Sequence, residues 1–137
     1  MPKPKNTKLS VFKGREARLN HTIFQTLTQR SPLAIYEIHK QIKTQRGLKH
    51  TKYTNVSRRV RALEESGYLD NAGIRDTQAG GQATLYQLAT RAQVALFLSQ
   101  ISPDTFIKEA DEDTLIAQLA ALTLFFEKTS QKDNTKD

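Results

Sequence analysis

Residues 51–69 read TKYTNVSRRVRALEESGYL, and this stretch decides the fold. Apolar side chains recur in it at intervals of three and four residues, which places on one side of a helix Tyr53, Val56, Val60 and Leu63. The opposite side carries polar and basic side chains, namely Thr51, Thr54, Asn55, Arg58 and Arg61. Gly67 tolerates the left-handed conformation that ends many helices. The pattern predicts an amphipathic basic helix from about Thr51 to Ser66, with Tyr53 in the core.

Two helices are expected before this segment. Leu19, Ile23 and Leu27 recur at four-residue spacing and predict a helix from about Arg15 to Gln29. Ser31-Pro32 offers an N-cap hydroxyl and a proline at the first helical position, which predicts a second helix ending near Lys43. The short polar connection 44–50 lets the basic helix cross the second helix at a steep angle.

The spacing of apolar residues changes after Leu69. Ile74–Thr77 and Ala83–Leu88 flank a turn at Gly80-Gly81, which predicts a hairpin whose inward face carries Tyr86 and Leu88. Further helices are expected from Thr90 to about Ile101 and from about Asp113 to Lys128. The predicted fold class is therefore mainly α with a small β-hairpin wing: a winged helix-turn-helix with additional C-terminal helices.

The positive charge lies in the first half of the chain. The 137 residues carry a net charge of +7, but residues 1–62 hold fifteen Lys and Arg against two acids, and residues 63–137 hold six against twelve. The halves therefore carry +13 and −6. A positive half attracts a polyanion to one part of the surface. Solvated surface lysines are the alternative interpretation.

The composition fits one folded domain with loose ends. We expect a basic flexible arm over 1–14, a winged-helix domain over 15–100, a C-terminal dimerisation region over 101–129 and a disordered tail over 130–137. There is no cysteine, no run of about 20 apolar residues and no secretory signal. We therefore expect a soluble cytoplasmic protein associated with the nucleoid.

Two phrases carry a family resemblance. Residues 61–69 read RALEESGYL and residues 86–90 read YQLAT. With the stretch Ser31–Ile38, they make residues 16–100 resemble winged-helix transcriptional regulators of prokaryotes, most closely the PadR and MarR groups and their archaeal relatives. The resemblance implies a homodimer that places two recognition helices in successive major grooves. The chain departs from many relatives at its wing tip, QAGGQ, which has no positive charge, so that Arg75 is the only basic residue of the hairpin.

The basic helix offers side chains suited to double-stranded DNA. Asn can bond adenine and Arg can bond guanine in the major groove, so Asn55 and Arg58 are the expected base readers. Phosphate contacts suit the flanking cations Lys49, Lys52, Arg59 and Arg61, with His50 as a further candidate. The predicted DNA-binding set is completed by Thr51, Thr54 and Arg75.

The sequence lacks the sets of residues that other functional classes require. His21, His39 and His50 are widely separated and no cysteine assists them, which argues against a metal site. Gly80-Gly81 lacks the Lys-Ser/Thr of a phosphate-binding loop. No nucleophile, base and orienting group form a set, so we expect neither an enzyme nor a cofactor.

Three alternatives remain open at this stage. An architectural chromatin protein would use the same winged helix with little sequence preference. A winged helix of the transcription machinery would bind another protein instead of DNA. The apolar C-terminal segment 91–128 is expected to form a homodimer, although it could also fold back on its own core.

Overall fold

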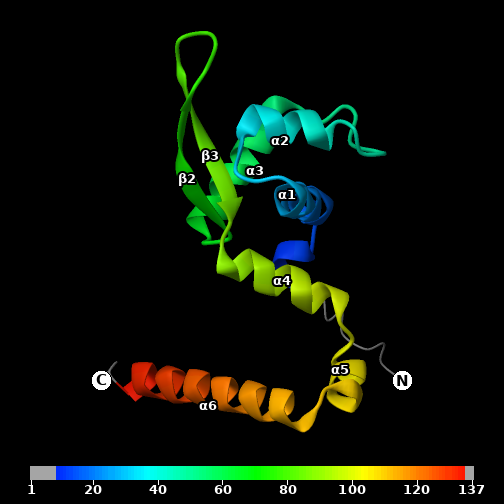
Figure 1. Ribbon diagram of the computed structural model, residues 1–137, viewed down its shortest axis with the longest axis vertical. Coiled ribbons are helices and arrows are strands. Elements are labelled where there is room, and N and C mark those ends of the chain that lie inside the picture. Colours follow the sequence, from blue (N-terminus) through cyan, green and yellow to red (C-terminus); the bar gives the residue numbers. More distant parts are fainter. Residues whose placement is uncertain (1–8, 135–137) are drawn as a thin grey trace. The chain divides into compact units, whose positions relative to one another are not determined.

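A computed structural model describes residues 9–134, with side chains to Ser130 (Figure 1). The chain divides into two compact units, Met1–Gln100 and Ile101–Asp137. The first unit contains a 3₁₀ turn η1 (Ser10–Phe12), then α1 (Ala17–Gln29), β1 (Leu33–Ala34), α2 (Ile35–Ile42), α3 (Tyr53–Glu65), β2 (Leu69–Asp76), β3 (Gln82–Leu88) and α4 (Thr90–Gln100). The second contains α5 (Pro103–Glu109) and α6 (Glu112–Asn134).

The first unit is a winged helix. Its three strands form an antiparallel sheet in the order β1-β3-β2, so that the two-residue strand β1 pairs with β3 and closes the sheet against the helices. The hairpin β2–β3 extends away from the helices as a wing (Figure 1). One extra residue, Ala72, makes a bulge where Asn71 faces Tyr86 and Gly73 faces Leu85. The predicted fold class is confirmed.

The core lies where α1, α2 and α3 meet the base of the wing. Each helix contributes apolar side chains from its predicted stripe, and the largest fully buried side chains are Ile23, Phe24, Leu27, Ile38, Ile42, Val56, Val60, Leu63 and Leu69. Tyr86 is also buried, and Leu88 is half-buried against the same cluster. Because α3 buries one stripe here, its other side is held outward in a fixed rotation.

Three expectations about this unit were wrong. The second helix begins at Ile35 rather than Pro32, because the backbone of Leu33–Ala34 pairs with β3 first. The segment expected to be a flexible arm reaches the core, since Val11 and Phe12 are buried and the Phe12 ring meets Phe24 edge-on. Residues 1–8 of that arm lie outside the described residues. Tyr53 is 47% exposed rather than buried.

The second unit consists of a short helix and a long one. α6 spans 23 residues and ends at Asn134, six beyond the predicted end at Lys128. The tail expected to be disordered over 130–137 is therefore helical as far as Asn134, and residues 135–137 lie outside the described residues. Along residues 112–130 every side chain is exposed except that of Leu115, which is half-buried. The large apolar ones are 53–65% exposed: Ile116, Leu119, Leu122, Leu124, Phe125 and Phe126. No helix in the described part of the chain is long and apolar enough to cross a membrane.

Candidate nucleic-acid interface

The outward side of α3 carries the predicted base-reading residues. Val56 and Val60 are fully buried and Leu63 is 2% exposed, which fixes the rotation of the helix. Thr54, Asn55, Arg58 and Arg61 are all exposed as a result. None of these four side chains hydrogen-bonds to another described residue. Their donors and acceptors are therefore available to a ligand.

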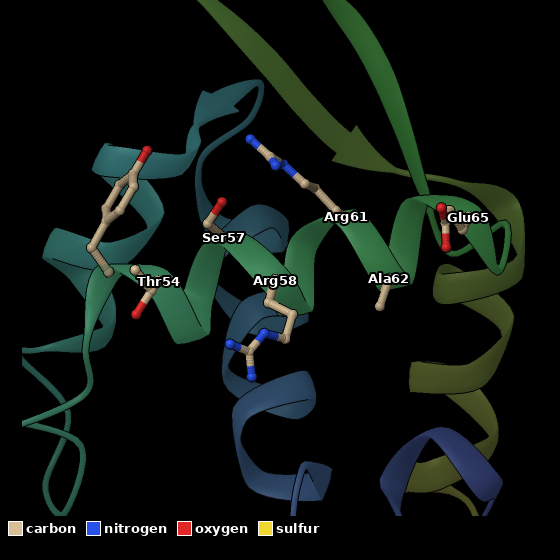
Figure 2. A pocket seen from close by; sticks show the side chains of 7 residues that line it. Thr54, Ser57, Arg58, Arg61, Ala62 and Glu65 are labelled. Carbon is tan, nitrogen blue, oxygen red and sulfur yellow. The ribbon is translucent and has the colours of Figure 1, made fainter.

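A shallow hollow of about 500 Å³ runs along this side of α3 (Figure 2). It is lined by Tyr53, Thr54, Ser57, Arg58, Arg61, Ala62 and Glu65. Ser57 and Arg61 point to one side of the helix axis and Arg58 points to the other (Figure 2). The hollow thus combines two guanidinium groups, three hydroxyls and the Glu65 carboxylate with the apolar surfaces of the Tyr53 ring and Ala62. Asn55 is exposed on α3 but does not line it.

The N-terminus of α3 is electrostatically uncompensated. Lys52 is the N-cap residue, its side chain makes no capping hydrogen bond, and no acid lies in the first turn. Lys49, His50 and Lys52 are exposed around this end. A helix N-terminus already carries partial positive charge, so added cations are unfavourable unless an anion binds there. This end of α3 is suited to a phosphate group.

The loop that leads into α3 is held by α1 and α2. His39 on α2 places its Nε2 atom 2.8 Å from the carbonyl oxygen of Thr51. Arg18 on α1 donates a hydrogen bond to the carbonyl of Arg46. Its guanidinium also lies against Gly47, where an added Cβ would come within 2.7 Å of Nη1. The half-buried Thr51 therefore acts through its backbone, and the cations beside it are carried on an anchored loop.

The sequence indicated only part of this support. Gly47 lies in the predicted connection 44–50, and its φ of +83° is a conformation that favours glycine. The roles of His39 and Arg18 had no local signal, because each acts on a residue at least 12 positions away in the chain. Ser57 was also missed, since it lies between the predicted outward residues and the apolar stripe.

Arg59 differs from the other cations of α3. It is half-buried, and its Nε atom is buried without a hydrogen-bond partner in the described part of the chain. Desolvating a charged donor in this way is unfavourable. Arg59 is therefore less available to a phosphate than the exposed Lys49, Lys52 and Arg61.

Arg75, the wing residue predicted to contact DNA, is bound within the protein. Its Nη2 atom lies 2.5 Å from Glu37 Oε1 and donates a hydrogen bond to the Tyr36 hydroxyl at 2.7 Å. Its guanidinium also lies 5.9 Å from the centre of the Tyr36 ring. These contacts join the wing to α2. An Arg75–phosphate contact requires this ion pair to open.

Glu37 is held by two donors that share one oxygen of its carboxylate. Its Oε1 atom also accepts a hydrogen bond from the Ala34 N–H at 3.1 Å, at the start of α2. Burial alone would raise the pKa of Glu37, but the Ala34 N–H and the Arg75 guanidinium outweigh burial and hold the pKa below its ordinary value of 4.5. The carboxylate is therefore charged at neutral pH and neutralises the only basic residue of the described wing.

Comparisons with known proteins give a fold likeness alone. No protein-family model matches the sequence, and no curated protein matches it. Among solved structures, that of the transcriptional regulator SlyA resembles this chain with a TM-score of 0.45 at 14% sequence identity. The likeness covers 93% of this chain and 84% of that one.

Proposed function

We propose that this protein binds double-stranded DNA in a sequence-specific manner, as a homodimeric transcription regulator whose recognition helix is α3. The observation that carries the proposal is the outward side of α3, where Asn55, Arg58 and Arg61 are exposed beside an uncompensated basic N-terminus. An α-helix fits the major groove of B-DNA, in which each base pair presents a distinct pattern of donors and acceptors. A regulator of this kind acts in the cytoplasm on the nucleoid and needs no cofactor or catalytic step.

Asn55 and Arg58 are the proposed base readers. Each good bidentate contact supplies about 1–3 kcal/mol of discrimination, or roughly 5- to 140-fold in relative affinity. Lys49, His50, Lys52 and Arg61 surround them and are assigned to phosphates. Phosphate contacts set the position of the helix without reading sequence.

Replacement of the base readers tests this division of roles. Asn55→Ala and Arg58→Ala are each expected to weaken binding and flatten the preference for the optimal duplex over a scrambled one. Gln25→Ala, which removes an exposed amide from α1, is the matched control and should change neither quantity. An equal loss on both duplexes in the Asn55 variant would remove Asn55 from the base readers.

The proposed dimer uses the C-terminal helices. On α6, Leu115, Leu119, Leu122 and Phe126 recur at intervals of four, three and four residues, which places them within one narrow seam. Leu124 and Phe125 extend the exposed apolar surface beyond this seam. α4 exposes Val94, Phe97 and Leu98 as well. A water-exposed helix with this much apolar surface is stabilised when a second copy covers it.

A charge placed in the seam tests the dimer. Leu119→Glu is expected to convert the protein from dimer to monomer in analytical ultracentrifugation and to weaken DNA binding with it. Gln118→Glu adds the same charge at the neighbouring exposed position outside the seam and should leave the dimer intact. A wild-type protein that sediments as a monomer at micromolar concentration would contradict the proposal.

Footprinting distinguishes the proposal from its two rivals. A regulator protects one site with dyad symmetry, whereas an architectural chromatin protein coats any duplex. A winged helix that binds only a protein partner gives no protection at all. Under that last alternative, neutralising Arg58 and Arg59 together would leave partner binding unchanged.

A further inference from the structure

Tyr53 presents an aromatic ring where the spacing of α3 predicted a core residue. It is the first residue of α3, it is 47% exposed, and it forms one end of the hollow beside Thr54 and Ser57. Its apolar neighbours in the stripe, Val56 and Val60, are fully buried. Folding therefore leaves a large apolar surface in water at the edge of the proposed DNA interface.

The ring is supported from behind by α2. The His39 and Tyr53 rings meet edge-on, with centroids 5.7 Å apart and planes at 85°. His39 is itself tied to the Thr51 carbonyl, two residues before Tyr53. The ring, the loop and the start of α3 thus form one supported group. An aromatic side chain held in place before binding loses little conformational entropy on contact with a ligand.

We propose that Tyr53 is a specificity-determining residue that contacts the C5 methyl group of a pyrimidine, which is thymine in unmodified DNA. The inference rests on the proposed function and adds a base contact to those of Asn55 and Arg58. In the major groove the thymine methyl group is the apolar feature that base edges present, and apolar side chains recognise it. The Tyr53 ring gives one end of the hollow this chemistry, while Arg58 and Arg61 supply donors further along the helix.

The test removes one methyl group at a time from the DNA. Each thymine of the preferred duplex is replaced in turn by deoxyuridine, and affinity is measured by fluorescence anisotropy for the wild-type protein, Tyr53→Ala and Tyr53→Phe. One deoxyuridine in a single half-site should weaken wild-type binding about fourfold, which corresponds to ~0.8 kcal/mol for one buried methyl-sized group. Tyr53→Ala should lose this sensitivity at the same position, and Tyr53→Phe, which keeps the ring, should retain it.

Two results would overturn the inference while leaving the proposed function intact. One is a duplex preference with no wild-type sensitivity to deoxyuridine at any position, or with a sensitivity that persists in Tyr53→Ala. The other is a loss of deoxyuridine sensitivity in Tyr53→Phe as large as that in Tyr53→Ala, which would assign the contact to the hydroxyl. By contrast, failure to obtain any preferred duplex would remove the proposed function and this inference together. Thermal melting of both variants checks that the fold is kept, as expected for an exposed side chain.

Discussion

Replacing Lys52 by Ala is expected to change how salt affects DNA binding. Lys52 is exposed at the N-cap of α3 and makes no ion pair with the described residues, so its charge is available to a phosphate. Each phosphate neutralised adds about 0.9 to the slope of log affinity against log salt concentration. A two-fold symmetric dimer loses two such contacts, so the slope should fall by about 1.8, against about 0.9 for a monomer.

The magnitude is large enough to measure. Between ~50 and ~200 mM salt, a slope change of about 1.8 makes the defect of Lys52→Ala roughly 12-fold larger at the lower concentration. Fluorescence anisotropy over this range gives the slope, and Lys52→Arg is the control because it keeps the charge. Folding should be unharmed, since removing a cation from a helix N-terminus is mildly stabilising. A slope equal to that of the wild-type protein would refute the phosphate contact.

Three further predictions concern the support of the interface. Ile38→Ala, which empties a fully buried site on α2, should lower the free energy of unfolding by about 2–5 kcal/mol in urea denaturation, and Ile38→Val by about 0.5–1.5 kcal/mol. Gly47→Ala should destabilise more than Gly14→Ala, because both have positive φ but only Gly47 lies against Arg18; equal losses would mean that this contact is unimportant. Glu37 has a lowered pKa, so its charged form contributes stability above pH 4.5 that is lost as the pH falls through its folded-state pKa. The stability difference between wild type and Glu37→Gln should therefore shrink in acid, and a difference that does not vary with pH would contradict the ion pair.

The sequence predicted the parts of the fold that depend on local periodicity. The stripe of Val56, Val60 and Leu63 identified α3 and its outward side, because a helix that buries one stripe must expose the opposite one. Tyr53 satisfied the same spacing but lies at the first position of the helix. There the stripe runs past the edge of the core, so periodicity alone assigned it wrongly.

Contacts between distant parts of the chain could not be predicted in this way. β1 is two residues long and exists because Leu33 and Ala34 pair with β3, some fifty residues later. The Glu37–Arg75 pair joins residues 38 positions apart. From the sequence alone, Arg75 is predicted to be an unpaired cation on the wing, whereas in the structure it forms an ion pair with Glu37 of α2.

A DNA-cleaving probe on α3 tests the central claim most directly. Because the chain has no cysteine, Thr54→Cys gives a single attachment point on the outward side of α3 for an iron–EDTA reagent. The account predicts two clusters of cuts on the selected duplex, about 10 base pairs apart between half-site centres. The same reagent on Gln25→Cys of α1 should give weaker cuts. Strong cutting from Gln25→Cys without focused cuts from Thr54→Cys would contradict the placement of α3 in the major groove.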